Sequence, residues 1–286
     1  MQRRTFLQSA GVAAAIAPFQ HHLYAGSVKK NAQDVVELGP KKVKVSRLAM
    51  GSGTNGGGGS SNQTRKLGVQ GLADLFHAAY DNGVFFFDSA DQYGTHPHVK
   101  AALQSIPREK VTLLSKTNAS NAADMRAALD RFRKELGTDY IDILLLHCMM
   151  DPDWNKRKRG AMDVIEEAQA KGIVRTKGVS CHTLGALKTA VAEPWVEVDL
   201  ARYNWAGAAM DADPPTVLAV LKEMKEAGKG IIGMKIFGAG KLVDKVDQSL
   251  QFALAADVLD CFTIGSESVA QFTDLTSKIP PASVRG

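Results

Sequence analysis

Short apolar runs alternate with longer amphipathic segments along almost the whole chain, and this repeat restricts the fold more than any other feature of the sequence. We predict strands at residues 47–51, 84–88, 111–115, 141–146, 174–179, 196–201, 230–234 and 260–264. Strands that alternate with helices build parallel sheets, because each helix returns the chain to the end where the next strand begins. Eight such repeats predict an α/β protein with a closed (β/α)8 barrel, or TIM barrel.

The segments between the apolar runs have the spacing of helices with one buried face. Met125, Leu129, Phe132 and Leu136 are three or four residues apart, and Gly137 is a typical helix stop. Residues 26–286 have about the usual length of one barrel, and no long linker divides them. We therefore predict a single barrel domain over these residues.

Four polar side chains lie at or just after the ends of predicted strands. Asp88 ends the second strand and Tyr93 follows it, whereas Lys116 and His147 follow the third and fourth strands. The carboxyl ends of barrel strands meet at one rim, where the active sites of such barrels form. Each residue alone has a structural explanation, such as an ion pair, a satisfied buried histidine or a packed tyrosine. All four at successive strand ends predict an active site.

The chemistry of this set follows from the pKa values of its members. The phenol of tyrosine has an ordinary pKa of about 10, which an adjacent ammonium group on Lys116 would lower. Asp88 would keep Lys116 charged, because burial alone favours the neutral amine. His147 would orient a substrate oxygen or share its proton. The set predicts a site that donates a proton to a developing oxyanion.

Six segments resemble those of the aldo/keto reductase family. They are VSRLAMGSGT (45–54), FFFDSADQYG (85–94), LLSKT (113–117), DILLLHCMM (142–150), GVSCH (178–182) and IIGMKIFGAG (231–240). The resemblance covers nearly the whole chain after residue 35. It implies a (β/α)8 barrel that transfers hydride between a nicotinamide cofactor and the carbon of an aldehyde, ketone or alcohol. It also implies that Tyr93 is the general acid, that Lys116 and Asp88 adjust its pKa, and that His147 positions the carbonyl.

The resemblance also implies contacts with the nicotinamide ring. Ser180 stands where the family holds the carboxamide, but Cys181 replaces the asparagine that usually follows. Leu200 replaces a glutamine that also holds the amide, and Met234 replaces the tyrosine that stacks on the ring. Gly51, which ends the first predicted strand, and Ser52, which follows it, are also expected to bind the cofactor.

The adenosine end of the cofactor is expected after the last strand. Gly265, Ser266, Glu267 and Ser268 precede a predicted helix, whose first amides would bind the phosphates. Gln271 stands where an arginine for the 2′-phosphate is expected, and Glu267 would accept a hydrogen bond from a ribose hydroxyl. These residues favour NAD(H) weakly over NADP(H), although Lys235 would be able to pair with a phosphate.

The amino-terminal segment has the pattern of a twin-arginine export signal. Arg3 and Arg4 precede a modest apolar stretch, residues 11–19, which is too short to span a bilayer. We predict a signal peptide over residues 1–25, recognition by the twin-arginine machinery, a periplasmic or otherwise exported protein, and no stable membrane anchor. An exported enzyme lacks a recycling pool of nucleotide, so we expect a tightly retained NAD(P)(H).

Charge gives no support to a nucleic-acid partner. Removal of residues 1–25 lowers the formal charge from +5 to +3, because this segment contains two arginines and no acidic residue. No basic patch with interleaved aromatic residues is present in the sequence. We therefore expect a small-molecule carbonyl or alcohol substrate and no nucleic acid.

Substrate contacts are expected from the loops that follow the strands. Trp154, Tyr203 and Trp205 are candidate lining residues, and the glycine-rich segment 51–64 is expected to form a mobile loop on the substrate side. Two other functions remain open at this point. They are a barrel that senses nucleotide without useful turnover, and a lyase or isomerase that transfers protons without net redox chemistry.

The cysteines allow more than one interpretation. Cys148 and Cys181 follow adjacent predicted strands, so an oxidising compartment would allow a disulfide, although free thiols are favoured. His147 and His182 lie next to them in the sequence, but no CxxC or HxxxH spacing supports a zinc site, and we predict no metal.

Overall fold

Eight parallel strands close into a barrel within residues 29–284, the part of the chain that the computed structural model describes. The strands are β3 (Leu48–Gly51), β4 (Phe86–Asp88), β5 (Thr112–Thr117), β6 (Ile141–Met149), β7 (Val174–Cys181), β8 (Val198–Arg202), β9 (Gly230–Met234) and β10 (Cys261–Gly265). Each strand pairs with the next along the chain, and β10 pairs with β3 to close the ring. The predicted barrel and all eight predicted strands are confirmed, whereas the predicted signal peptide lies outside the described residues.

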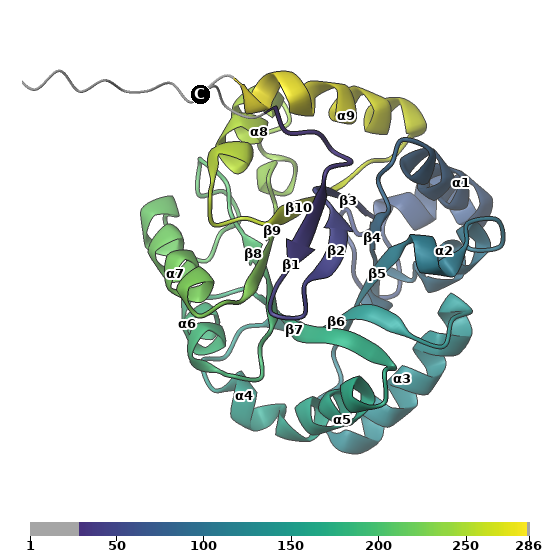
Figure 1. Cartoon of the computed structure of the whole chain (residues 1–286), viewed down its shortest axis with the longest axis vertical. Helices are drawn as coiled ribbons and strands as arrows, with labels where there is room; N and C mark the ends of the chain where they lie inside the picture. The colour runs from purple at the N-terminus through teal and green to yellow at the C-terminus, as the bar shows by residue number, and fades with distance from the viewer. Residues whose placement is uncertain (1–28, 285–286) are drawn as a thin grey trace, which may run out of the picture.

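Helices surround the barrel as an outer ring (Figure 1). They are α1 (Asn62–Asp81), α2 (His96–Ala102), α3 (Ala122–Leu136), α4 (Trp154–Arg157), α5 (Arg159–Ala170), α6 (Leu184–Ala192), α7 (Pro214–Glu226), α8 (Val246–Ala255) and α9 (Val269–Ser283). The predicted helix stop is correct, because Gly137 caps α3 in a left-handed conformation with φ 66°. None of the described helices combines the length and apolar character needed to cross a bilayer.

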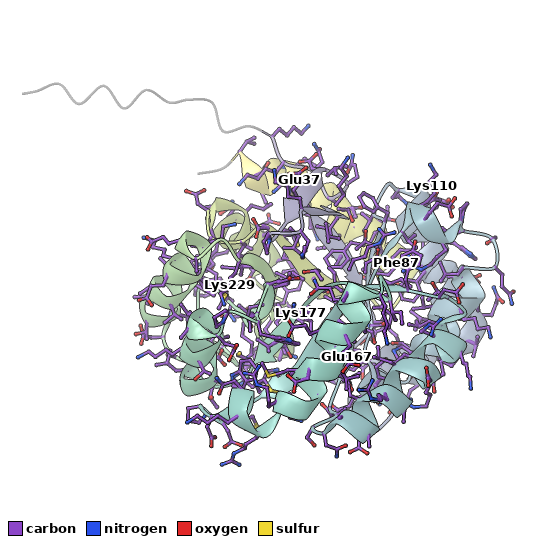
Figure 2. The ribbon with its side chains drawn as sticks, turned by 60° about the horizontal axis from the view of Figure 1, so that its bottom comes forward. Glu37, Phe87, Lys110, Glu167, Lys177 and Lys229 are labelled. Atoms are coloured by element: carbon purple, nitrogen blue, oxygen red, sulfur yellow. The ribbon has the colours of Figure 1, made fainter. Side chains whose placement is uncertain are left out.

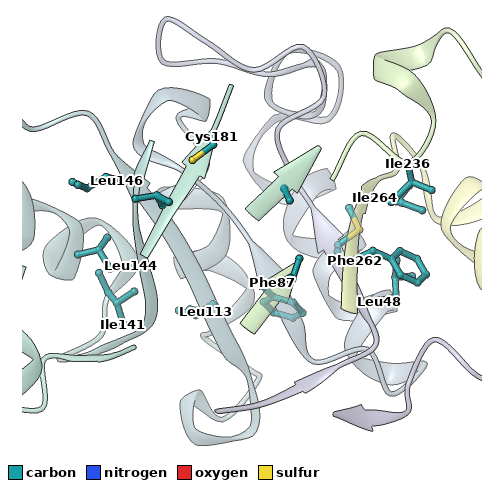
Figure 3. Packing of buried hydrophobic residues seen from close by; sticks show 14 of the residues in the cluster. Leu48, Phe87, Leu113, Ile141, Leu144, Leu146, Cys181, Ile236, Phe262 and Ile264 are labelled. Atoms are coloured by element: carbon teal, nitrogen blue, oxygen red, sulfur yellow. The ribbon is translucent and has the colours of Figure 1, made fainter. Parts of the chain in front are cut away.

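Side chains of the strands alternate between the barrel interior and the layer under the helices. Phe86, Leu114 and Leu145 belong to the interior cluster, whereas their neighbours Phe87, Leu113 and Leu144 belong to the outer layer, part of which Figure 3 shows. Because a strand has a side-chain period of two, the interior positions continue to Asp88, Lys116 and His147. Two-residue periodicity therefore aims these polar groups into the carboxyl end of the barrel.

The helices of the outer ring have one face buried against the strands and one face exposed to solvent. Phe87 lies in the interior of the molecule, and Glu167 of α5 lies on the outer surface (Figure 2). Glu167 pairs there with Arg126 of α3 at 2.8 Å. This division of each helix into a buried and a charged face is the pattern on which the helix predictions rest.

A hairpin that was not predicted closes the amino end of the barrel. Strands β1 (Val35–Leu38) and β2 (Val43–Ser46) pair in antiparallel fashion and lie across the ring in Figure 1. Leu38 and Val45 of the hairpin are fully buried in the interior cluster. Gly39 has φ +62°, and a Cβ atom there would lie 2.9 Å from the carbonyl oxygen of Glu197. The hairpin thus packs too closely on the barrel for a side chain at this turn.

Candidate active site

A buried ion pair lies at the carboxyl end of the barrel. The ammonium group of Lys116 is fully buried, contacts Asp88 Oδ1 and donates a hydrogen bond to the carbonyl oxygen of Ser89 at 3.0 Å. The second oxygen of Asp88 accepts a hydrogen bond from the hydroxyl of Thr263 at 2.8 Å. With both carboxylate oxygens engaged, Asp88 holds the lysine in one position.

Tyr93 and His147 lie against this ion pair. The Nζ atom of Lys116 is 4.7 Å from the centroid of the Tyr93 ring. The rings of Tyr93 and His147 meet edge to face, with centroids 5.5 Å apart and an interplanar angle of 83°. The structure therefore brings together all four residues that the sequence analysis singled out, on β4, the turn after β4, β5 and β6.

Burial shifts the pKa values of Tyr93 and Lys116, and for Tyr93 the direction differs from the expected one. It raises the pKa of the Tyr93 phenol, and the opposing effect of Lys116 is smaller, so the expected lowering of this pKa is wrong for the protein alone. Burial also lowers the pKa of Lys116, but Asp88 and Tyr93 more than offset this and leave that pKa raised. At neutral pH the phenol is thus protonated and faces a charged ammonium group.

His147 is neutral over the physiological pH range. Burial, followed by the charges of Lys116, His182 and Lys235, lowers the pKa of His147 to about 3. Its Nδ1 atom is buried and has no hydrogen-bond partner among the described residues. The side chain is therefore available as a neutral hydrogen-bonding group.

A cavity of about 550 Å³ extends from this cluster to the loop between β10 and α9. Of the predicted cofactor residues, its wall contains Gly51, Met234, Lys235, Gly265, Ser266, Glu267 and Gln271. The wall is apolar at Leu200 and Met234 and polar at Ser266 and Gln271. A Cβ atom on Gly265 would lie 2.4 Å from the hydroxyl of Thr54, so bare backbone forms this part of the wall. A cavity of this volume with a mixed apolar and polar wall is of the size and kind that bind small-molecule ligands and cofactors.

Three predicted cofactor residues have other roles in this structure. Ser52 is fully buried and donates a hydrogen bond to the carbonyl oxygen of Asp88 at 2.8 Å. Ser180 is also fully buried, and its hydroxyl accepts a hydrogen bond from the amide of Cys148 at 2.9 Å. Ser268 caps α9 by accepting a hydrogen bond from the amide of Gln271. These hydroxyls hold the backbone around the cavity and are absent from its wall.

The three aromatic residues expected to contact substrate do not line the cavity. Trp154 is 2% exposed, and its indole donates a hydrogen bond to the carbonyl oxygen of Ala186 under α6. Tyr203 packs on Phe252 of α8, and the indole of Trp205 donates a hydrogen bond to Ser249 of the same helix. These three side chains pack between the loops that follow the strands and the outer helices. The apolar side chains in the wall are instead those of Leu200, Met234, Ile236, Phe237, Val243, Val246, Ile264 and Leu275.

Several residues of the site escaped the sequence analysis. Thr263 occupies an interior position on β10, and its place near a strand end is the signal that would have identified it. Asn62 and Lys66 of α1 both contact the carboxylate of Glu267 across the cavity rim. Gln63 donates hydrogen bonds to the Thr54 hydroxyl and the carbonyl oxygen of Ser266. No local sequence pattern marks the contacts with Ser266 and Glu267, because these residues lie about 200 positions from α1.

All three cysteines are free thiols. Cys148 is half-buried, and its sulfur lies 3.1 Å from Nδ1 of His182. Cys181 and Cys261 are buried, and Figure 3 shows Cys181 within the layer between the strands and the helices. Cys148 and Cys181 therefore do not form a disulfide in this structure.

This arrangement predicts a thiol titration. In the folded protein without reductant, we expect Cys148 to react first with a disulfide reagent, because burial shields the other two sulfurs. All three thiols should react after unfolding, and Cys148→Ser should remove the early reaction. Recovery of a single thiol from the unfolded, unreduced protein would contradict the free-thiol assignment.

Among the described residues, one group has possible metal ligands within 4.8 Å of one another, and it consists of Asp91, His96 and Glu135. Arg131 pairs with Asp91 at 2.7 Å and with Glu135 at 3.1 Å. The imidazole of His96 lies 2.7 Å from the hydroxyl of Ser115, behind the active-site strand β5. The single guanidinium group of Arg131 bridges both carboxylates, so we interpret the group as an ion-pair network.

The fold and the rim together define a class of (β/α)8-barrel proteins that place a tyrosine beside an ion-paired lysine. A family model described as "Aldo/keto reductase family" matches residues 47–269, and the chain belongs to this family. D-threo-aldose 1-dehydrogenase from a Pseudomonas species is 25% identical over 201 residues, which are 59% of this chain and 60% of that enzyme. The chain thus spans less than two thirds of that relative's length.

Solved structures confirm the fold. A protein from Pseudomonas aeruginosa assigned to the aldo-keto reductases superposes with a TM-score of 0.74 at 20% identity, over 89% of this chain and 98% of its own. An aldo/keto reductase from Klebsiella pneumoniae, solved with NADP and acetate, superposes with a TM-score of 0.65 at 19% identity, over 88% and 90% of the two chains.

Proposed function

We propose that the protein is an NAD(P)(H)-dependent oxidoreductase that interconverts an aldehyde or ketone with the corresponding alcohol. The observation that carries this proposal is the buried Lys116–Asp88 pair beside Tyr93, where Asp88 and Tyr93 line a cavity of about 550 Å³. Membership of the aldo/keto reductase family supports it.

Tyr93 acts as the proton donor to the carbonyl oxygen. Its phenol is protonated at neutral pH, and the ammonium group of Lys116 stabilises the phenolate that remains after transfer. Asp88 keeps that ammonium group charged in a fully buried position. Neutral His147 orients the substrate oxygen through a hydrogen bond. A bound nicotinamide would supply the hydride, or accept it in the reverse reaction.

The identity of the nucleotide belongs to the same proposal. The weak preference for NAD has two grounds, Gln271 in place of an arginine and the acidic Glu267, and the carboxylate of Glu267 contacts Lys66 and Asn62. A carboxylate that is neutralised in this way repels a phosphate less than a free one. The comparisons do not support the preference either, since the Klebsiella pneumoniae structure contains NADP. We therefore propose NAD(P)(H), with affinity for each form to be measured.

We also propose that the protein is exported and that it retains its nucleotide cofactor. The paired arginines at residues 3 and 4 support passage through the twin-arginine pathway, and an exported enzyme would keep its nucleotide and use two successive substrates. Native mass measurement of protein purified from its own compartment, followed by release of any nucleotide, tests this directly. Protein that is free of nucleotide and binds it only at micromolar concentration would contradict retention.

The catalytic proposal is tested by incubating the purified protein with NADH or NADPH and a panel of aldehydes, ketones and aldoses. We expect the nicotinamide absorbance to fall with at least one carbonyl. Nucleotide binding without any such fall would favour a sensor. Consumption of a substrate without an absorbance change would favour a lyase or isomerase.

A further inference from the structure

The glycine-rich loop, residues 53–60, lies directly against the ring of Tyr93. A Cβ atom on Gly53 would lie 2.2 Å from Cε2 of Tyr93, and one on Gly56 would lie 2.4 Å from Cδ1. Both distances are far below van der Waals contact. The two ring atoms belong to opposite edges of the ring, so the loop backbone approaches Tyr93 at both edges.

Hydrogen bonds hold the loop in this position. The amide of Gly56 donates to the carbonyl oxygen of Gly53 at 3.0 Å, which closes a turn between the two contact points. The amide of Gly59 donates to the carbonyl oxygen of Gln92 at 2.9 Å, and so ties the loop to the residue before Tyr93. A Cβ atom on Gly94, the residue after Tyr93, would lie 2.1 Å from the carbonyl oxygen of Gly59.

The other glycines of the loop are not constrained in this way. A Cβ atom on Gly57, Gly58 or Gly59 would have no neighbour within 4 Å. Gly53, Gly56 and Gly57 all have φ outside the left-handed region, so a side chain there would be limited by space and not by backbone strain. Gly58 and Gly59 have positive φ, so glycine is favoured there by backbone conformation, whereas at Gly53 and Gly56 a side chain is excluded by the contact with Tyr93.

We infer that the glycine-rich loop is a backbone cradle that fixes the phenol of Tyr93 between Lys116 and His147, and that Gly53 and Gly56 are positioning residues for it. This inference rests on the proposed function for its catalytic consequence. Lys116 and His147 contact the ring from the barrel, and the loop closes the remaining edges. A methyl group at residue 53 or 56 must displace either the loop or the ring, because neither contact leaves room for it.

The test compares Gly53→Ala and Gly56→Ala with the matched control Gly57→Ala. Each protein is labelled with ¹³C at the phenol carbon of its five tyrosines, and the Tyr93 signal is assigned with Tyr93→Phe. We expect the Tyr93 signal to shift in both cradle variants. Its titration midpoint should fall, because burial is the main cause of its raised pKa. Gly57→Ala should leave both quantities unchanged.

Kinetics supply the second readout. We expect kcat to fall about 10- to 100-fold in Gly56→Ala, with little change in KM, because misplacement by about 1 Å is enough for such a loss. An unmoved Tyr93 signal in folded Gly53→Ala and Gly56→Ala would overturn the cradle. The spectrum requires no substrate, so a displaced ring in a protein without carbonyl reductase activity would uphold the cradle and reject the proposed function.

Discussion

Replacement of Tyr93 by phenylalanine is expected to lower kcat by about 10²- to 10⁴-fold, the usual contribution of a positioned general acid. The variant keeps the ring that fills the cradle and lacks only the phenol oxygen. Lys116 and Asp88 retain each other as partners, so we expect the fold to persist. Affinity for NAD(P)(H) should change by no more than about threefold, because the missing proton acts only in the transition state.

Tyr203→Phe is the matched control for this experiment. Tyr203 is 3% exposed, packs against Phe252 and lies away from the cavity wall, so its hydroxyl should be dispensable for turnover. Steady-state kinetics and nucleotide titration of the three proteins separate the outcomes. A Tyr93→Phe protein with nearly normal kcat would remove Tyr93 from the proton-transfer step and revive the nucleotide-sensor alternative.

Replacement of Asp199 by asparagine is expected to stabilise the protein at pH 8 and to have little effect near pH 4. Asp199 lies on β8, is fully buried, and has no ion-pair partner among the described residues, and the weak thiol donor of Cys181 lies close to its carboxylate. Burial, together with the charge of Asp211, raises the pKa of Asp199 to about 8. The thiol of Cys181 and the charge of Lys229, labelled in Figure 2, offset only part of this shift.

The sign of the effect follows from proton linkage. Between the ordinary pKa of 3.8 and the folded-state pKa of about 8, the folded protein binds a proton at Asp199 that the unfolded chain releases. The free energy of unfolding therefore decreases as the pH rises through this window. A shift of this size corresponds to at most about 6 kcal/mol, at about 1.4 kcal/mol for each pH unit.

Urea denaturation of wild type and Asp199→Asn at pH 5 and pH 8 measures this contribution. The difference between the two proteins should be several-fold larger at pH 8. Asp142→Asn is the contrasting control, because the carboxylate of Asp142 accepts hydrogen bonds from Arg108 at 2.7 Å and from the amide of Leu113 at 2.9 Å. That variant should lose stability at both pH values. Equal pH dependence in wild type and Asp199→Asn would show that Asp199 does not titrate in this range.

The barrel and the four rim residues were predictable because both depend on short-range periodicity. Apolar runs located the eight strands, and strand alternation carries Asp88, Lys116 and His147 to interior positions. The hairpin β1–β2 was missed because its strands are four residues long and interrupted by Glu37 and Lys44. Short mixed strands give a weak signal, although Gly39 and Pro40 between the two valine-rich segments mark the turn.

The properties that escaped prediction depend on distant packing. The direction of the Tyr93 pKa shift reflects how deeply the ring is enclosed, which neither Tyr93 nor Lys116 reveals in the sequence. Trp154 and Trp205 follow strands as substrate residues often do, yet both hydrogen-bond to groups on the outer helices. Position along the chain determined which rim these residues approach, but not which way their side chains turn.

The β1–β2 hairpin covers one end of the barrel. Leu38 and Val45 fill that end, and the cavity lined by Asp88 and Tyr93 lies at the opposite end. Lys41 and Lys42 at the outer tip of the hairpin have exposed side chains, at 51% and 74%. They are therefore natural attachment points for a solid support or a fusion partner, since a molecule tethered there presents its open face to the solution.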